Sequence, residues 1–502
     1  MTVSLDKVPF EDALNMTGFG RFNYGIFLLV GSIITGMGFE IFSVAYLVPA
    51  SACELNTTSF HQGLMAATPL VGIIATSHIW GYLADTRGRK KILRYSMMLG
   101  FCAGAAATLS PNWIVFSVLK LMSSSAVAGS YALSITLLSE CTPMSRRNTV
   151  IILTGTVFMA CQGIMAALSI PVLPLTFSFY IPYLDIHFNS WRLLNLIFSC
   201  PCAISAFGLL FAYESPKYLL SSGDHDQAMD ILKRVFVVNT GKDKDLYMVK
   251  SVVLDEDNGS KKTTGFWSSI VVQTTPLLKP PLLWNTLLIS VIFVIVYICF
   301  NPYMVWLPFM ADGFMRAVEG GAQDMTICDM IRSSQNATNN SQTENTCALN
   351  QIAMLMVFGI GILLAVLNTV LGTLVNYLGR KNLLIGIQIV SGIAGLCINS
   401  STYWILSAVL FIIYVAGVLN FGYLSSFSVD VFPTYVKAMA VCLTLMVGRG
   451  SAVVGINLLK DLLDTNCEAS FYIFASVTIV GGMIGLLLPS DKALAKQKCP
   501  ET

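Results

Sequence analysis

The chain has 502 residues, of which 55% are hydrophobic and 12% are charged, and its formal net charge is +2. This composition is too apolar for a soluble globular protein, because such a protein needs polar residues to cover its core. The nearly neutral charge gives no basis for binding nucleic acid. Apolar runs of about 20 residues, enough to cross a bilayer as a helix, recur throughout. The sequence therefore predicts an all-α integral membrane protein embedded in a lipid bilayer.

Twelve apolar runs predict twelve transmembrane helices in two halves of six. The N-terminal half, residues 25–213, contains runs at about 25–47, 62–84, 92–109, 113–138, 149–171 and 191–213. The C-terminal half, residues 282–488, contains runs at about 282–305, 351–375, 382–399, 403–425, 438–459 and 470–488. A polar linker, 214–281, joins the halves, and terminal segments 1–24 and 489–502 flank them.

The distribution of basic residues predicts the orientation. Arg and Lys gather near 85–91, 146–147, 214–217 and 379–381, whereas 48–61, 110–112 and 171–190 contain neither. The positive-inside rule then places the linker and both termini in the cytoplasm. A plasma membrane and an intracellular vesicle or granule membrane both fit this pattern.

The opposite face is predicted to be glycosylated and disulfide-bonded. Asn56, Asn336 and Asn339 each begin an acceptor sequon. Four outward cysteines allow three pairings, and we expect Cys328–Cys347 because one predicted loop holds both. Cys53–Cys467 is a second, less favoured pair.

One charged sequence motif occurs twice in the chain. GYLADTRGRKK occupies 81–91 and GTLVNYLGRK occupies 372–381, and both join the second span of a half to its third. Two related halves suit transport by alternating access, in which they rock around a central site. Gly81 is predicted to let two helices approach closely. Asp85 is predicted to pair with Arg89 or with the start of a neighbouring helix, in a tether that breaks and re-forms.

GYLADTRGRKK resembles the G-x-L-a-D-r-x-G-R-K signature of the major facilitator superfamily. SECTPMSRR at 139–147, YESPKYLL at 213–220 and VDVFPTYVKA at 429–438 resemble segments of its sugar and organic-ion transporters. FGRFNYGIFLLVG and GFEIF look most similar to the synaptic vesicle glycoprotein two branch. The resemblance implies the major facilitator fold and a gating network at the cytoplasmic face. Its members would be Asp85, Arg89, Glu140 and Glu214 in the first half, and Arg380 and Asp430 in the second.

The sequence departs from this family pattern at several positions. Asn376 replaces the second Asp, which predicts a weaker tether in the second half. Lys120 stands where relatives carry Arg. In GMGFE at 36–40, Met37 replaces an intramembrane Asp that could couple transport to protons. Facilitated diffusion is therefore nearly as favoured as proton coupling.

Ionisable residues inside spans cost about 2.5–3.5 kcal/mol to insert and are candidates for function. Glu40 could bind a cationic solute or carry a coupling proton, or it could form a buried pair with Lys120. Arg449 could neutralise an anionic solute group or pair with a carboxylate. Aromatic faces attract cations, so Tyr297, Asn301 and Trp306 could line the solute cavity, although Trp306 also suits an interfacial belt. Asn420 is a further polar candidate.

These observations predict a monomeric secondary transporter for a small organic solute, with a cationic or zwitterionic solute favoured. No phosphate-binding loop, metal-ligand spacing or nucleophile–base pattern is visible, so we expect no cofactor, no metal and no enzymatic activity. The alternative is a non-transporting membrane glycoprotein that acts as a receptor or a regulator of vesicle traffic.

Overall fold

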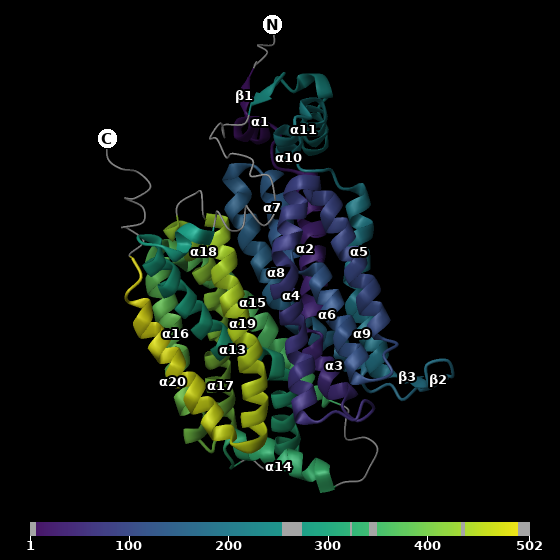
Figure 1. The fold of residues 1–502 in the computed structure, drawn as a ribbon, viewed down its shortest axis with the longest axis vertical. Coiled ribbons are helices and arrows are strands. Elements are labelled where there is room, and N and C mark those ends of the chain that lie inside the picture. The colour runs from purple at the N-terminus through teal and green to yellow at the C-terminus, as the bar shows by residue number, and fades with distance from the viewer. Residues whose placement is uncertain (1–6, 254–273, 322–323, 341–348, 433–436, 490–502) are drawn as a thin grey trace.

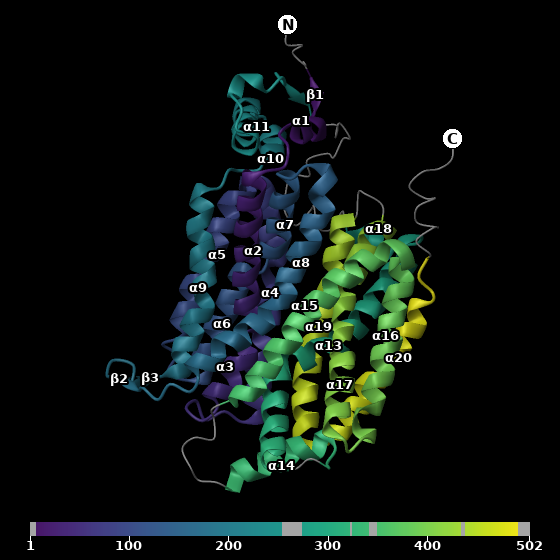
Figure 2. The ribbon, with the colours of Figure 1, turned by 180° about the vertical axis from the view of Figure 1, so that it is seen from behind.

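The computed structural model describes residues 7–253, 274–321, 324–340, 349–432 and 437–489. Two helical bundles stand side by side, the N-terminal one purple to blue and the C-terminal one green to yellow (Figure 1). One end of the molecule carries a small subdomain, and we call it the subdomain face. The other end carries a β-hairpin and helix α14, and we call it the hairpin face (Figures 1 and 2).

The N-terminal half contains eight helical segments. They are α2 (Arg21–Phe42), α3 (Val44–Ser51), α4 (Ser59–Arg87), α5 (Arg89–Ala107), α6 (Trp113–Val127), α7 (Ser130–Glu140), α8 (Met144–Val172) and α9 (Ser190–Phe211). Two breaks fall inside spans, at Ser43 between α2 and α3 and at Ala128–Gly129 between α6 and α7. Each broken pair forms one of the six predicted spans.

The C-terminal half is built in the same way. Its long helices are α13 (Leu282–Glu319), α15 (Gln351–Leu378), α16 (Arg380–Cys397), α17 (Trp404–Val415), α18 (Asn420–Val431), α19 (Lys437–Thr465) and α20 (Cys467–Gly485). The 3₁₀ turn Ala416–Leu419 joins α17 to α18 into one span, and two more 3₁₀ turns cover Thr275–Leu278 and Ile398–Ser400.

Twelve spans are confirmed. Eleven helices among the described residues are long and apolar enough to cross a membrane. The twelfth is α5, whose first turns carry Arg89, Lys90, Lys91 and Arg94, so its mean hydropathy is low. It packs between α6 and α9 in the N-terminal bundle.

The halves meet mainly along two helix pairs, α8 with α15 and α4 with α19, and α3 also packs on α13. A Cβ atom added at Gly361 would lie 2.5 Å from the backbone nitrogen of Gly163, so the α8 and α15 backbones touch at their crossing. Small residues permit such approaches between membrane helices. Gln162 on α8 also donates to the carbonyl of Met304 on α13, over 3.2 Å.

The N-terminal segment and the linker form one subdomain rather than two separate regions. Strand β1 (Val8–Pro9) pairs in parallel with β4 (Val252–Val253), beside α1 (Phe10–Met16), α10 (Pro216–Ser222), α11 (His225–Thr240) and the 3₁₀ turn Lys244–Leu246. Phe10, Leu14, Leu232 and Val252 contribute to a hydrophobic core separate from that of the bundle. Glu11 forms a 2.6 Å ion pair with Arg147 at the start of α8, which fixes the subdomain to the N-terminal half.

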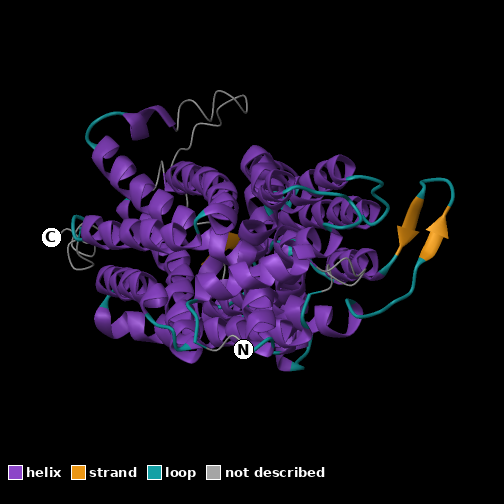
Figure 3. Cartoon of the chain, turned by 90° about the horizontal axis from the view of Figure 1, so that it is seen from below, coloured by secondary structure: helices purple, strands orange, loops and turns teal. Residues whose placement is uncertain are grey.

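The hairpin face differs from the sequence prediction. Strands β2 (Phe179–Ile181) and β3 (Ile186–Phe188) pair antiparallel and project sideways (Figure 3). The segment expected to be a loop contains helix α14 (Ile327–Asn340), whose backbone includes Asn336 and Asn339. Asn56 is exposed between α3 and α4 on the same face.

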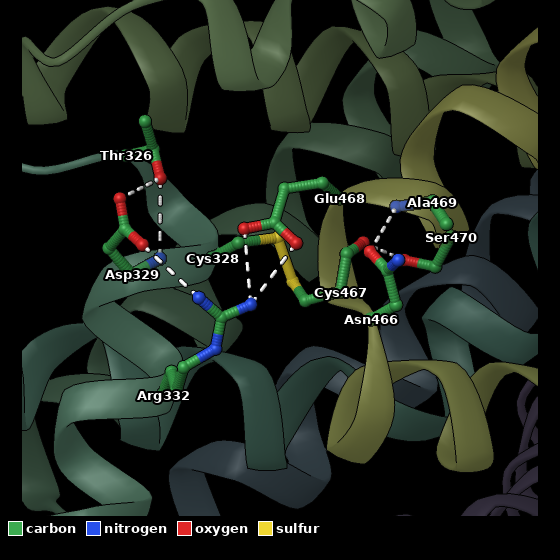
Figure 4. The surroundings of a disulfide bond; sticks show 9 residues. All are labelled: Thr326, Cys328, Asp329, Arg332, Asn466, Cys467, Glu468, Ala469 and Ser470. Carbon is green, nitrogen blue, oxygen red and sulfur yellow. Dashed lines mark hydrogen bonds and ion pairs between the residues drawn. A yellow bond between two sulfur atoms is a disulfide. The ribbon is translucent and has the colours of Figure 1, made fainter.

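The predicted Cys328–Cys347 disulfide is wrong. Cys328 on α14 is bonded to Cys467, the first residue of α20, with 5.6 Å between the Cα atoms (Figure 4). This bond also excludes the predicted Cys53–Cys467 pair, although Cys53 is itself disulfide-bonded. Cys347 lies outside the described residues. The disulfide shows that the first turn of α14 lies against the start of α20. This proximity could not be predicted from the distance between the two cysteines in the sequence.

Candidate transport site and gating network

The repeated phrase produces the same turn in each half. Gly88 and Gly379 both adopt positive φ, +98° and +79°, between two long helices. In each half, the lysine two residues after this glycine donates a hydrogen bond to a backbone carbonyl at the end of the last helix of that half. Lys90 reaches the Leu210 carbonyl at 3.4 Å, and Lys381 reaches that of Leu486 at 2.8 Å. The sequence repeat is therefore a structural repeat.

The predicted first-half network is assembled at the subdomain face. Arg89 Nε lies 2.9 Å from Glu140 Oε2, and Arg89 Nη2 lies 3.8 Å from the mostly exposed carboxylate of Asp85. Glu214 accepts a 2.9 Å hydrogen bond from the Lys90 amide at the N-terminus of α5, where a helix favours negative charge. Ser215 donates to Glu140 and links the network to α10. All these contacts lie within the N-terminal half and its subdomain.

The three other predicted gating residues are Gly81, Arg380 and Asp430, and the structure contradicts the role predicted for Gly81. A Cβ added at Gly81 would meet no atom within 4 Å, so the expected close helix approach there is wrong. The close approach occurs at Gly72, where a Cβ would lie 2.8 Å from the Leu121 carbonyl oxygen on α6. Arg380 reaches Ser426 Oγ on α18 at 3.2 Å. Asp430 lies on α18, but its side chain is outside the described part of the structure.

Glu40 and Lys120 form a completely buried ion pair. Lys120 Nζ lies 3.0 Å from Glu40 Oε2, and both side chains have no exposed area. Ser123 donates to the same oxygen at 2.7 Å. Gly104 on α5 and Ser199 on α9 lie on the other side of the carboxylate. A Cβ atom added at Gly104 would lie 2.3 Å from Glu40 Oε1 and would also contact Ser199 Oγ. All these neighbours belong to the N-terminal half, so the pair lies inside that bundle rather than between the halves.

Two sets of aromatic rings, three in the N-terminal half and two in the C-terminal half, approach each other, and we call the five rings the inter-half aromatic cluster. Phe158 lies 5.5 Å from Tyr131 and 5.6 Å from Phe42, centroid to centroid. Tyr297 stacks on Phe421 at 4.4 Å. Tyr131 and Tyr297, from opposite halves, are close enough to interact electrostatically. All five rings are only partly buried, so part of each ring surface is exposed.

Two asparagine amides lie near this cluster without hydrogen-bond partners among the described residues. Asn301 follows Tyr297 by one helical turn on α13, and its Oδ1 is buried and unpaired. Asn420 precedes Phe421, is fully buried, and has neither amide atom paired. An unpaired buried polar group is costly, so these amides are positions where a bound molecule would gain hydrogen bonds.

Arg449 lies beside the aromatic cluster. It is half-buried on α19 and interacts electrostatically with His78 on α4, across the two halves. Its neighbour Gly448 lets the Tyr297 ring pack on the α19 backbone, since a Cβ there would lie 2.7 Å from the ring. Arg449 therefore directly follows in sequence the residue on which the Tyr297 ring packs.

Trp306 is buried rather than placed in an interfacial belt. It is 1% exposed and donates to the Ile456 carbonyl on α19 at 3.1 Å. Lys460 lies 5.5 Å from its ring and pairs with Asp464 at 3.0 Å. Trp306 therefore joins α13 to α19 within the C-terminal half, near the hairpin face.

Comparison with known proteins decides the family. The Major Facilitator Superfamily profile matches residues 28–322, which is more than half of the chain. The chain belongs to the Major Facilitator Superfamily. Human SVOPL, which its name gives as a candidate transporter, is 24% identical over 504 residues, covering 96% of this chain and 91% of that protein.

Other relatives of this major facilitator protein are synaptic vesicle glycoproteins. Mouse synaptic vesicle glycoprotein 2B is 26% identical over 325 residues, or 61% of this chain and 47% of the relative. The chain thus spans about half the length of these relatives. The fold is similar to that of the E. coli xylose transporter XylE in its partially occluded inward-open conformation, with a TM-score of 0.67 and 14% identity. That match covers 94% of this chain and all of that one.

Sequence reasoning missed several residues of this major facilitator protein. Arg192 is fully buried at the start of α9 and donates a 2.7 Å hydrogen bond to Glu54. Its guanidinium carbon lies 4.5 Å from the centroid of the Trp191 ring. An arginine inside the predicted span 191–213 was the available signal. For Tyr131 and Phe158 there was none, because aromatic residues are common throughout apolar helices.

Substitution of Gly88 tests how the turn between α4 and α5 is built. Gly88→Ala is expected to destabilise the protein by about 1–3 kcal/mol, because a side chain is strained at positive φ. The added Cβ would also lie 2.6 Å from Glu214 Oε2. Thermal unfolding of the purified protein measures the change. Gly81→Ala is the matched control, since its Cβ enters open space within a helix and should change stability little or raise it slightly. Equal losses in both variants would contradict the assignment.

Proposed function

We propose that this protein is a secondary transporter that moves a small organic solute across a membrane by alternating access. The observation that carries the proposal is the inter-half aromatic cluster, to which both halves contribute partly buried rings. Rings from opposite halves must separate or close when the halves rock, so a solute held between them would be exposed to each side in turn.

The chemistry of the cluster favours a cationic or zwitterionic solute. Aromatic faces attract cations, and the interaction strengthens where water is excluded. Tyr131, Tyr297 and Phe421 provide such faces, while Arg449 would take the carboxylate of a zwitterion. The unpaired amides of Asn301 and Asn420 would hydrogen-bond its neutral groups.

The contacts between the halves indicate which face is closed in this structure. Near the hairpin face, Gln162 bonds to Met304 and Gly63 packs on Asn457, where a Cβ would lie 2.6 Å from the amide oxygen. We infer that the hairpin face is the outer one, because the basic turns around Arg89 and Arg147 lie at the opposite face. Transport would then require these outer contacts to open.

The role of Glu40 in coupling is part of the same proposal. A carboxylate paired with Lys120 inside the bundle could release its partner on protonation, which would change how α2 and α6 pack. Uniport remains the competing mechanism, because Met37 occupies the position of the family's intramembrane Asp. Uptake measured with and without a proton gradient, in wild type and Glu40→Gln, distinguishes the two.

Uptake into proteoliposomes tests the transport proposal. A panel of amines, zwitterionic amino-acid derivatives, nucleosides and sugars is offered to the wild-type protein, and the best solute is then offered to Tyr297 variants. Tyr297→Ala should lower uptake at least tenfold with little change in the thermal midpoint, whereas Tyr297→Phe should retain most of it. Phe207→Ala is the matched control, because that ring is 63% exposed on α9 and outside the cluster.

Three outcomes would overturn the assignment. Unchanged uptake in Tyr297→Ala, or an equal loss in Phe207→Ala, would remove the aromatic cluster from the solute path. Specific binding without uptake of any solute would favour the receptor or vesicle-regulator alternative, since the relatives include synaptic vesicle glycoproteins.

A further inference from the structure

A groove of about 690 Å³ lies between α4, α6 and α19, away from the inter-half aromatic cluster. It is lined by one face of α4 from Ser59 to Val71, by α6 around Val118, and by α19 from Val453 to Asp461. Because α4 and α6 belong to one half and α19 to the other, the groove crosses the seam between the halves.

The walls of the groove are apolar and open. Phe60 is 71% exposed, Val118 50% and Val71 44%. Ser59 and Val71 are twelve positions apart, which corresponds to about 18 Å along the helix axis. One leaflet of a bilayer contributes about 15 Å of hydrocarbon, half of the whole core. The groove therefore has the length and the surface for an acyl chain of the leaflet next to the hairpin face.

The groove ends in a single uncompensated charge. Asp461 lines it at the hairpin-face end, is exposed, and forms no ion pair within the described ranges. The neighbouring Lys460 does not neutralise it, because its ammonium lies 3.0 Å from Asp464 and 4.3 Å from the centroid of the Phe309 ring. The lining contains no Lys or Arg. A headgroup seated here would need a positive charge, and an anionic headgroup would be repelled.

We propose that this groove binds a phosphocholine lipid, with an acyl chain along α4 and the choline ammonium at Asp461. The lipid bridges the two halves at the seam where Gly63 packs on Asn457. A second groove of about 620 Å³ offers a comparison, because it lies wholly within the C-terminal half and its lining, which includes Val390, contains no charged residue.

Lipid binding to the full-length protein in detergent tests the proposal. Native mass spectrometry compares lysophosphatidylcholine with lysophosphatidylglycerol of the same acyl chain, so that only the headgroup differs. Wild type should bind the choline lipid at least fivefold more tightly. Asp461→Asn should abolish this preference, and Val118→Trp should weaken binding of the choline lipid at least tenfold by filling the groove. Val390→Trp, at a position 57% exposed in the second groove, should leave the preference unchanged.

Three results would overturn the proposal. One is equal binding of the two lipids by wild type, and another is a preference that survives Asp461→Asn. The third is soluble choline binding as tightly as the lipid, which would reassign the site to a water-soluble cation. Thermal midpoints of all variants distinguish a lost site from a misfolded protein.

Discussion

Replacing Lys120 by Met is expected to lower the free energy of unfolding by about 3–5 kcal/mol, because it leaves a buried carboxylate without its counter-ion. Both side chains of the Glu40–Lys120 pair are completely buried, at 3.0 Å. Ser123 supplies one hydrogen bond, but the other carboxylate oxygen of Glu40 has no partner among the described residues. The protein cannot easily solvate the remaining charge there.

The double variant Glu40→Gln with Lys120→Met is the control. It removes both charges and keeps similar volumes, and replacing a whole buried pair is often neutral or stabilising. We therefore expect a stability close to that of wild type. Reversible unfolding of wild type, Lys120→Met, Glu40→Gln and the double variant gives the coupling energy between the two residues. A double variant as unstable as the single one would show that packing, not charge, is responsible.

Removing the Cys328–Cys467 disulfide is the second change that we expect to lower the stability of the protein strongly. The bond joins residues 139 positions apart, and loss of such a cross-link typically costs about 2–5 kcal/mol. Cys328→Ser should therefore lower the thermal midpoint markedly and free the start of α14 from α20. The measurement is thermal unfolding of wild type and variant under non-reducing conditions.

Arg332→Gln is the matched control for the disulfide. Arg332 Nη2 lies 3.1 Å from Glu468 Oε2 and joins the same two helices, as Figure 4 shows. Its side chain is half exposed, and exposed ion pairs contribute about 0–1 kcal/mol. A loss as large as that of Cys328→Ser would mean that the ion pair, not the covalent bond, holds α14.

The sequence by itself was sufficient for the architecture. Twelve apolar runs and the repeated turn predicted two related halves, and the halves carry matching turns at Gly88 and Gly379. Bilayer thickness fixes the length of a span, and a charged turn between two spans is readable without knowing what surrounds it. The contacts of Arg89 with Asp85 and Glu140 followed from the same local signal and the family resemblance.

Only the tertiary structure decided which residues meet. It placed Glu40 against Lys120 within one bundle, bonded Cys328 to Cys467, and brought Tyr131 near Tyr297 from the other half. The residues of each pair are far apart in sequence, and apolar helices carry little pattern to show which face meets which neighbour. The helix lengths follow from the membrane, whereas the partners of each side chain follow from helix rotation and packing.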